Sequence, residues 1–355
     1  MSISPFDHPF LGKLLGHPEV EACFSAEEDV RQMLAFERVL AEEQGKIGLI
    51  SSASVSAIVT AIGEFEVDPE DLATQTAKDG VVVPGLVRQI RKKLTDNQKA
   101  SLHKGATSQD VIDTSLMLRL KKAMAFIQAD LKEVLQNLTS LNETFGDQTV
   151  MARTRMQQAL PIKAGHKING WEEPLRRLQG KWESLSGELL HIQLGGAVGD
   201  LSTFGGKGLE LKEKMAFALG LSFTEKGWHT DRSALSEFAS WLAQISTTLG
   251  KIGMDIVLMA QTEVGEIELR SAGGSSAMPH KQNPVQAEIL VSLARYSAGQ
   301  LGMFQQAALH ENERSGSGWT LEWLILPQMV IAAGAGLRIA GELTDNIKEI
   351  RPMEQ

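Results

Sequence analysis

The sequence predicts an all-α protein built around a bundle of long helices. Proline breaks a helix interior, and it is absent from two long stretches of the chain, residues 85–160 and 175–278. Runs of alternating β-branched residues, the usual signal for a strand, are scarce, and only Val81–Val83 is expected to be extended. These observations favour a helical bundle over a mixed or all-β fold.

The first proline-free stretch predicts one helix from Ala106 to Phe145, because glycine is absent there as well. From Leu120 onward its apolar positions alternate spacings of four and three residues, which places them along one helix face. At 1.5 Å per residue this helix is about 55–60 Å long. It is roughly three times the usual length of a helix in a globular protein.

The second stretch predicts another striped helix from Leu235 to Met259. Gly250 and Gly253 lie inside it, and their small side chains let a neighbouring helix approach closely. Three further helices are expected over residues 162–191, 285–312 and 327–350.

The helix pattern also predicts a division of the chain and an assembly. The first hundred residues hold shorter helical pieces and more prolines, so we expect an N-terminal helical domain over residues 1–103. Residues 104–355 form the central long-helix domain, which carries the oligomer contacts and an active-site loop.

Helices this long cannot bury their stripes inside one 38.6 kDa subunit, so a homo-oligomer is expected. A monomeric rod or a two-helix coiled coil is the alternative.

The composition excludes several classes of protein. The chain has 35 Lys and Arg against 44 Asp and Glu, and this acidic balance argues against a nucleic-acid-binding protein. Its single cysteine, Cys23, forms no intramolecular disulfide and fits a reducing compartment. We find no signal-peptide pattern and no run of 18 apolar residues, so a cytoplasmic protein without a membrane span is expected.

One loop carries residues suited to chemistry. In residues 273–284, GGSSAMPHKQNP, glycines and prolines bracket polar side chains directly after a predicted helix. The Ser275 hydroxyl, the Lys281 ammonium and the Asn283 amide could all face one anionic ligand. From composition alone, an ordinary helix–helix connection explains this segment equally well.

The same loop matches the signature G-S-S-x-M-P-x-K-x-N-P, and on this basis the chain resembles the fumarase/aspartase superfamily. Two further segments resemble that superfamily in the correct order, HKGATSQD at residues 103–110 and ARTRMQQA at residues 152–159. The resemblance covers nearly the whole chain. It implies a long helical bundle assembled as a homotetramer, with each active site built from three subunits, and chemistry on carbon next to a carboxylate.

Within the superfamily, the chain resembles the lactonising branch, the 3-carboxy-cis,cis-muconate cycloisomerases of the protocatechuate branch of the beta-ketoadipate pathway. The segments beginning at Leu194, Trp228 and His310 carry this resemblance. Adenylosuccinate and argininosuccinate lyases have a histidine where this chain has Arg155. An elimination of their type is the alternative activity, and a non-catalytic structural homologue is a further one. Typical members continue into additional C-terminal helices, so the resemblance implies a missing or truncated C-terminal domain.

The resemblance also implies a reaction and residue roles. One carboxylate of a small polycarboxylate adds across a conjugated double bond, so no metal or cofactor is needed. Ser275 delivers the proton to carbon, Lys281 stabilises its oxyanion, and His103 and His229 are further candidates for the proton donor. The residues expected to bind substrate are Thr107, Ser108, Arg155, Gln157, His229, Asn283 and Arg314. The alternatives remain open that Ser275 is a loop-packing hydroxyl, that Arg155 is a surface arginine and that Arg314 forms a salt bridge at a subunit interface.

Overall fold

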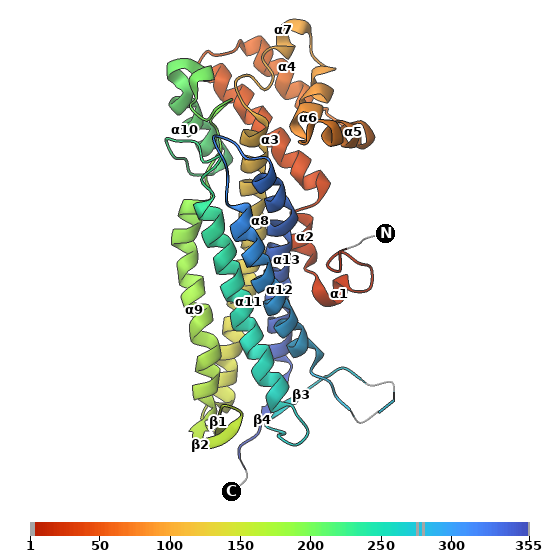
Figure 1. Cartoon of the computed structure of the whole chain (residues 1–355), viewed down its shortest axis with the longest axis vertical. Coiled ribbons are helices and arrows are strands. Elements are labelled where there is room, and N and C mark those ends of the chain that lie inside the picture. Colours follow the sequence, from red (N-terminus) through yellow and green to blue (C-terminus); the bar gives the residue numbers. More distant parts are fainter. Residues whose placement is uncertain (1–3, 275–276, 279–280, 354–355) are drawn as a thin grey trace.

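The computed structural model describes residues 4–274, 277–278 and 281–353. Long helices run side by side along the molecule, and most of the short helices gather at one end of them (Figure 1). We call this end the cap end, and the end that carries the strands the strand end. The predicted all-α class is confirmed, since strands are few and short among the described residues. The predicted division between residues 103 and 104 stays a prediction.

Five long helices form the bundle: α8 (Ser108–Phe145), α9 (Ala164–Leu189), α11 (Ser233–Met259), α12 (Val285–Ala307) and α13 (Ser317–Asp345). Helix α3 (Ala26–Lys46) packs along α8 and leads to the cap end. The shorter helices are α1 (Gly12–Leu15), α2 (Pro18–Ala22), α4 (Ser52–Gly63), α5 (Pro69–Asp79), α6 (Val83–Arg91), α7 (Asp96–Lys99), α10 (Gly208–Leu219) and the 3₁₀ turn η1 (Ser202–Lys207).

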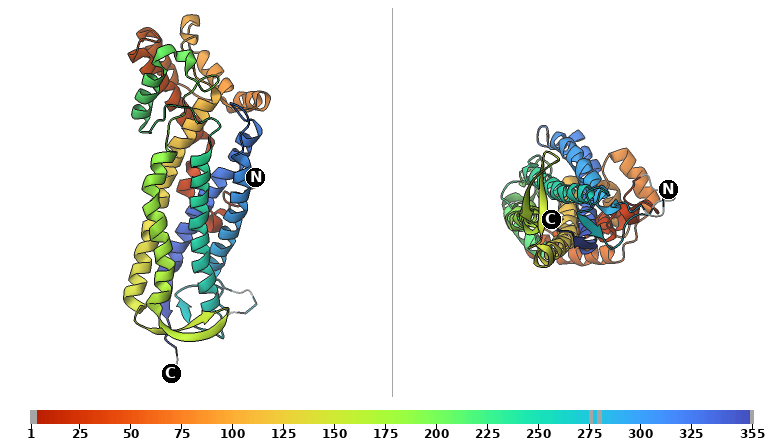
Figure 2. Two further views of the ribbon diagram at one scale, coloured as in Figure 1. Left: turned by 60° about the vertical axis from the view of Figure 1, so that its left-hand side comes forward. Right: turned by 90° about the horizontal axis from the view of Figure 1, so that it is seen from below.

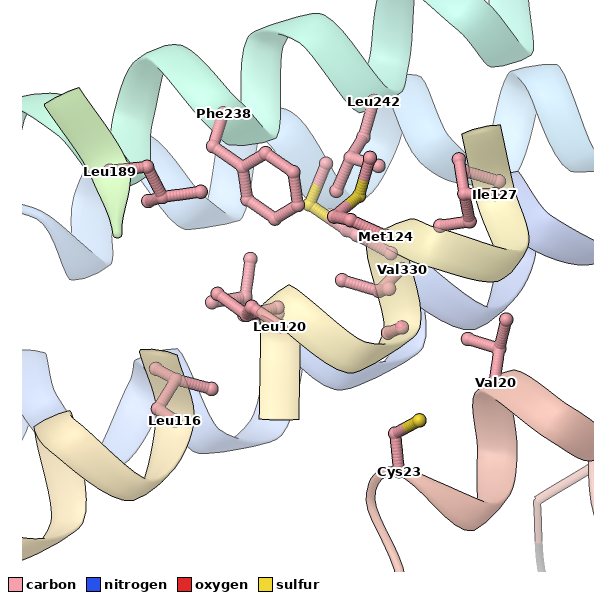
Figure 3. Close-up of a cluster of buried hydrophobic side chains, with 14 of the residues drawn as sticks. Val20, Cys23, Leu116, Leu120, Met124, Ile127, Leu189, Phe238, Leu242 and Val330 are labelled. Atoms are coloured by element: carbon pink, nitrogen blue, oxygen red, sulfur yellow. The ribbon is translucent and has the colours of Figure 1, made fainter. Parts of the chain in front are cut away.

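Helix α8 forms where the sequence predicts it. A capping box fixes its start, in which the Thr107 side chain accepts a backbone N–H and the Asp110 carboxylate accepts the Thr107 N–H at 3.0 Å. The predicted apolar stripe is buried, and Leu120 and Met124 lie near Phe238 of α11 (Figure 3). Complete burial of one such side chain contributes about 1.5–3 kcal/mol to folding. The stripe therefore holds the bundle together.

The glycines of α11 allow the close approach that the sequence predicts. A Cβ atom on Gly253 would lie 2.9 Å from the Cβ of Leu290 in α12 and closer still to the Ala287 carbonyl. A Cβ atom on Gly250 would collide with Ala294. Larger residues at these positions would push α12 away from α11.

Two local predictions are wrong. Val81–Val83 is not an extended segment, because Val83 begins α6 and Pro84 occupies the first turn of that helix, where proline is tolerated. Pro327 does not begin the last helix but lies inside α13, which begins at Ser317. Proline has no N–H, so the carbonyl of Trp323, four residues earlier, lacks its helical donor.

Among the described residues, four short strands lie at the strand end (Figure 2). Strands β1 (Thr149–Thr154) and β2 (Gln157–Lys163) form an antiparallel hairpin between α8 and α9. Strand β3 (Ile267–Leu269) pairs with β4 (Ile347–Ile350). The sequence analysis missed these strands, because each is short and lacks a long alternating pattern.

Helix α13 is long and apolar enough to cross a membrane by length and composition. However, 72% of its apolar window is buried inside the protein, which is typical of a core helix. Buried small residues such as Ala332, Ala335 and Gly336 let its neighbours pack closely against it.

Candidate functional site

The predicted site residues lie at two opposite ends of the bundle (Figures 1 and 2). The cap end holds His103, Thr107, Ser108, His229 and Arg314, and the strand end holds Arg155, Gln157, Lys281 and Asn283. Helix α8 separates the two groups with 38 residues, or about 57 Å at 1.5 Å per residue. Ser275, the predicted proton donor, lies outside the described residues. One chain alone therefore does not bring the predicted site together.

Asp110 organises the cap end. Its carboxylate is completely buried and accepts the backbone N–H groups of Gly195 and Gly196 at 2.9 and 3.0 Å, in addition to that of Thr107. His229 Nε2 lies 2.8 Å from Asp110 Oδ1. Asp110 therefore joins the first turn of α8 to the loop after α9 and to the loop before α11.

His229 is buried in a pocket made by glycines. A Cβ atom on Gly195 would lie 2.5 Å from His229 Cε1, and Gly199 and Gly227 approach the same ring. Gly199 also has a φ of 90°, a conformation that favours glycine. The ring is 4% exposed, so within one chain it supports Asp110 rather than facing solvent.

Arg314 brings a cation to the first turn of α8. Its guanidinium donates to Thr107 Oγ1 at 2.8 Å and to the carbonyls of Gly196 and Ala197 at 3.2 and 3.1 Å. Arg314, Thr107 and Ser108 are all partly exposed. A helix N-terminus beside a cation forms a binding place for an anion such as a carboxylate.

A fully buried ionic network lies behind Arg314. The Arg232 guanidinium forms two contacts with Asp113, at 2.9 and 3.1 Å, and two with Glu322, both at 2.8 Å. Burial disfavours its charge, but the two carboxylates outweigh that cost and raise the pKa of Arg232 above its ordinary value. The indole of Trp319 donates to Asp113 at 3.0 Å.

His310 ties the loop of Arg314 to the same network. Its Nε2 lies 3.0 Å from Glu322 Oε1, while its buried Nδ1 has no hydrogen-bond partner among the described residues. A Cβ atom on Gly318 would lie 2.9 Å from the His310 ring, so the glycine allows this close contact. The loop from His310 to Arg314 is thereby fixed at its first residue.

His103 lies next to the carboxylate of Glu37, with Nδ1 2.5 Å from Oε1. Burial disfavours the imidazolium, but Glu37 and then Asp110 outweigh it and hold the pKa of His103 above its ordinary value. The residue has a φ of 59°, which is unusual for a side chain other than glycine or asparagine. The protonated form of His103 is therefore favoured at the cap end.

Lys212 of α10 is a further buried cation near this cluster. Its side chain is completely buried, and its Nζ donates to the Lys226 carbonyl at 2.9 Å. Burial lowers the pKa of Lys212 to about 8, although Asp110 partly opposes that shift. The sequence analysis assigned no role to this residue.

The strand end presents a second set of cations. Arg155 and Met156 form the turn of the β1–β2 hairpin with positive φ values of 48° and 67°, and both are exposed. The hairpin lines a groove of about 790 Å³ together with Lys167 and Lys251. Arg153 and Lys167 are paired with the buried carboxylate of Glu266. The side chain of Arg155 forms no ion pair with another described residue and lies exposed at the turn of the hairpin.

Lys281 and Asn283 lie close to the same end, just before α12. Gly273 and Asn283 exchange two backbone hydrogen bonds of 2.8 Å, which closes the base of the loop. Lys281 is exposed, and its backbone N–H donates to the Met278 carbonyl at 3.0 Å.

Comparison with known proteins identifies the family. Residues 20–299 match the family described as lyase. The 3-carboxy-cis,cis-muconate cycloisomerase of Pseudomonas aeruginosa is 34% identical over 98% of this chain and 77% of its own length. The chain belongs to the lyase family, within the fumarase/aspartase superfamily.

Other members of the lyase family are similarly related. The N-acetyl-S-(2-succino)cysteine lyase of Enterococcus italicus is 31% identical over 93% of this chain and 73% of its own length. The crystal structure of the 3-carboxy-cis,cis-muconate lactonizing enzyme from Pseudomonas putida has a TM-score of 0.89 and 33% identity, covering 97% of this chain and 78% of that one. This likeness confirms the predicted fold.

The carboxylates that hold the cap end of this lyase together were not predicted from the sequence. Asp110 and Asp113 lie within or directly after the HKGATSQD segment, but Glu322 and Arg232 are distant from it in sequence. The capping-box pattern of Thr107 and Asp110 was visible as a signal. Nothing in the sequence paired Arg232 with its two acidic partners.

Proposed function

We propose that this lyase is a cycloisomerase that converts 3-carboxy-cis,cis-muconate to a carboxymuconolactone, in the protocatechuate branch of the beta-ketoadipate pathway. The similarity to proteins of that name, 34% over 98% of the chain for the Pseudomonas aeruginosa relative, carries the proposal. The cycloisomerases from Bradyrhizobium diazoefficiens and Pseudomonas putida are 34% and 35% identical. A cytoplasmic location is part of the proposal.

The cap end supports recognition of a polycarboxylate. Thr107 Oγ1 accepts a hydrogen bond from Arg314 and one from the first turn of α8, so its own proton is free to be donated to a ligand. Arg314 and the backbone N–H groups at the start of α8 add positive charge there. In the proposal, Thr107, Ser108 and Arg314 bind one carboxylate of the substrate.

The reaction needs positioning and one proton. The substrate supplies its own nucleophile, a carboxylate that attacks the conjugated double bond, and a proton then adds to carbon. We assign the proton to Ser275, with its oxyanion stabilised by Lys281, and keep His103 as the second candidate because Glu37 favours its protonated form. Arg155, Gln157, Asn283 and His229 are proposed to bind or orient the remaining carboxylates.

These roles require an oligomer, because the cap-end and strand-end residues are about one α8 length apart in one chain. In the proposed homotetramer, the cap end of one copy meets the strand ends of others. Exposed apolar side chains such as Met156, Leu160 and Leu309 support this assembly, since contact between copies would bury them. In the proposed function, the homo-oligomer is needed because the active site is complete only when copies of the chain assemble.

A second candidate activity is elimination from a succinyl adduct. Two N-acetyl-S-(2-succino)cysteine lyases, at 31% and 30% identity, favour it. Adenylosuccinate and argininosuccinate are further adducts of this kind. All these adducts carry carboxylates of the kind that the cap end is proposed to bind, and they differ from one another in the leaving group.

A direct ultraviolet assay tests the proposal. We expect 3-carboxy-cis,cis-muconate to lose its conjugated-diene absorbance in the presence of the protein, with the lactone as product by NMR. Turnover of N-acetyl-S-(2-succino)cysteine, adenylosuccinate or argininosuccinate, with no effect on the muconate, would replace it with the elimination. A folded protein that turns over none of these substrates would indicate a non-catalytic structural homologue.

A further inference from the structure

A cavity separate from both groups of site residues lies where the N-terminal helices meet the bundle. It has a volume of about 300 Å³ and is lined by α3, α5, the turn before α6, α8 and α13. This volume is at the lower end of the range for small-molecule sites. None of the residues predicted to bind or transform substrate lines it.

The walls of the cavity are mostly apolar. Ile112 and Leu116 of α8, together with Val81 and Val82, contribute aliphatic surface, and Trp323 contributes an aromatic surface. Trp323 is 36% exposed, so the cavity has an indole at an accessible edge. Such walls suit a single aromatic ring, which gains affinity from burial of its faces.

Arg119 and Asp29 form the polar part of the cavity together with Glu322. Arg119 is 8% exposed, and its buried Nε–H has no hydrogen-bond partner among the described residues. Its NH2 group lies 3.1 Å from Asp29 Oδ1, the oxygen that also accepts the Ser115 hydroxyl at 2.8 Å. No hydrogen bond between described residues ends on Asp29 Oδ2. The cavity therefore has one buried donor without an acceptor, Arg119 Nε–H, close to the carboxylate of Asp29, whose side chain is 31% exposed.

These charges select the ligand. The carboxylates of Asp29 and Glu322, which both line the cavity, would repel an anionic ligand, and the guanidinium of Arg119 would repel a cationic one. A neutral hydroxyl can accept from the Arg119 Nε–H and donate to Asp29 at the same time. A buried donor without an acceptor destabilises the empty cavity, so a ligand that accepts this hydrogen bond gains affinity.

We propose that this cavity is a binding site for a small neutral phenol, with the ring between Leu116 and Trp323 and the hydroxyl between Arg119 and Asp29. The site is independent of the proposed cycloisomerase activity, since it uses none of the substrate residues.

The probe for this site is 4-bromophenol, which is neutral at pH 7. Titration calorimetry of the whole protein should give one saturable site per chain, and the anomalous signal of a co-crystal should place bromine inside the cavity. 4-Bromobenzoate, of similar size but negatively charged, should bind at least tenfold more weakly. Bromine found elsewhere, or equal affinity for the benzoate, overturns the proposal.

Variants test the named contacts. Leu116→Phe should fill the cavity and abolish binding, and Val81→Phe, at another residue that lines the cavity, is the second filling variant if the first does not fold. Arg119→Met should keep the cavity but weaken binding at least tenfold. Leu324→Phe, at a position of α13 that is 62% exposed and does not line the cavity, is the matched control and should bind normally. Unchanged binding in both filled variants overturns the proposal.

Discussion

The guanidinium of Arg314 donates to the hydroxyl of Thr107 at 2.8 Å, although 207 residues separate them in sequence. This contact attaches the loop after α12 to the first turn of α8. It also directs a permanent positive charge to the one partly exposed helix start that carries both Thr107 and Ser108. Arg314 is therefore the residue on which recognition of a carboxylate at the cap end depends in the proposed function.

Replacement of Arg314 by methionine should impair catalysis without unfolding the protein. A hydrogen bond to a charged group contributes about 1.5–3 kcal/mol, so kcat/KM for the muconate should fall about tenfold to a hundredfold. Steady-state kinetics measures this change. Arg295→Met, at an exposed position of α12, is the control. A normal kcat/KM in the Arg314 variant would remove Arg314 from the site.

Mixed oligomers of two inactive variants should recover activity. Arg314→Met damages the cap end, and Lys281→Met damages the strand end. A site shared between copies is intact when its cap end comes from a Lys281→Met copy and its strand end from an Arg314→Met copy. If the copies assemble at random in equal amounts, roughly one quarter of the sites are intact. The measurement is the activity of co-refolded variants, compared with each variant refolded alone. No recovery, in a mixture shown to contain hybrid oligomers, contradicts the shared site.

Replacement of Arg232 by methionine should destabilise the protein strongly. The change leaves Asp113 and Glu322 buried without their cation, and breaking a buried ion pair in this way costs about 3–5 kcal/mol. Urea unfolding at fixed protein concentration measures the loss. Arg176→Met is the control, because the Arg176 side chain is 52% exposed and surface pairs contribute about 0–1 kcal/mol. Similar losses in both variants would contradict a special role for the network.

Stability should depend on the protonation of His103. Its folded-state pKa is raised, so folding favours the charged form. The contribution is fully present below the unfolded pKa of about 6.5 and is lost as the pH rises through the higher folded pKa. Asparagine accepts the left-handed backbone at this position and does not titrate, so His103→Asn is the matched variant. The difference in Tm between wild type and variant should be largest in acid and shrink in base, and a pH-independent difference would contradict the His103–Glu37 pairing.

Sequence alone determined the helices and the family. The absence of proline and the regular apolar spacing are local properties, so they predicted α8 and α11 to within two residues at either end. The loop signature likewise stands in a continuous segment, and it led to the correct superfamily. Pro327 misled the prediction of α13 because a helix packed in a core tolerates a proline that an isolated one does not.

Only the tertiary structure decided how the site residues are distributed. Spacing along the chain does not reveal that Thr107 and Arg314 meet, since their contact depends on how α8 and α13 pack. Nor does it reveal that the loop before α12 comes to the same end of the bundle as the β1–β2 hairpin. Local sequence fixes backbone conformation over a few turns, whereas the pairing of Arg232 with Asp113 and Glu322 arises from helices brought together by their buried apolar stripes.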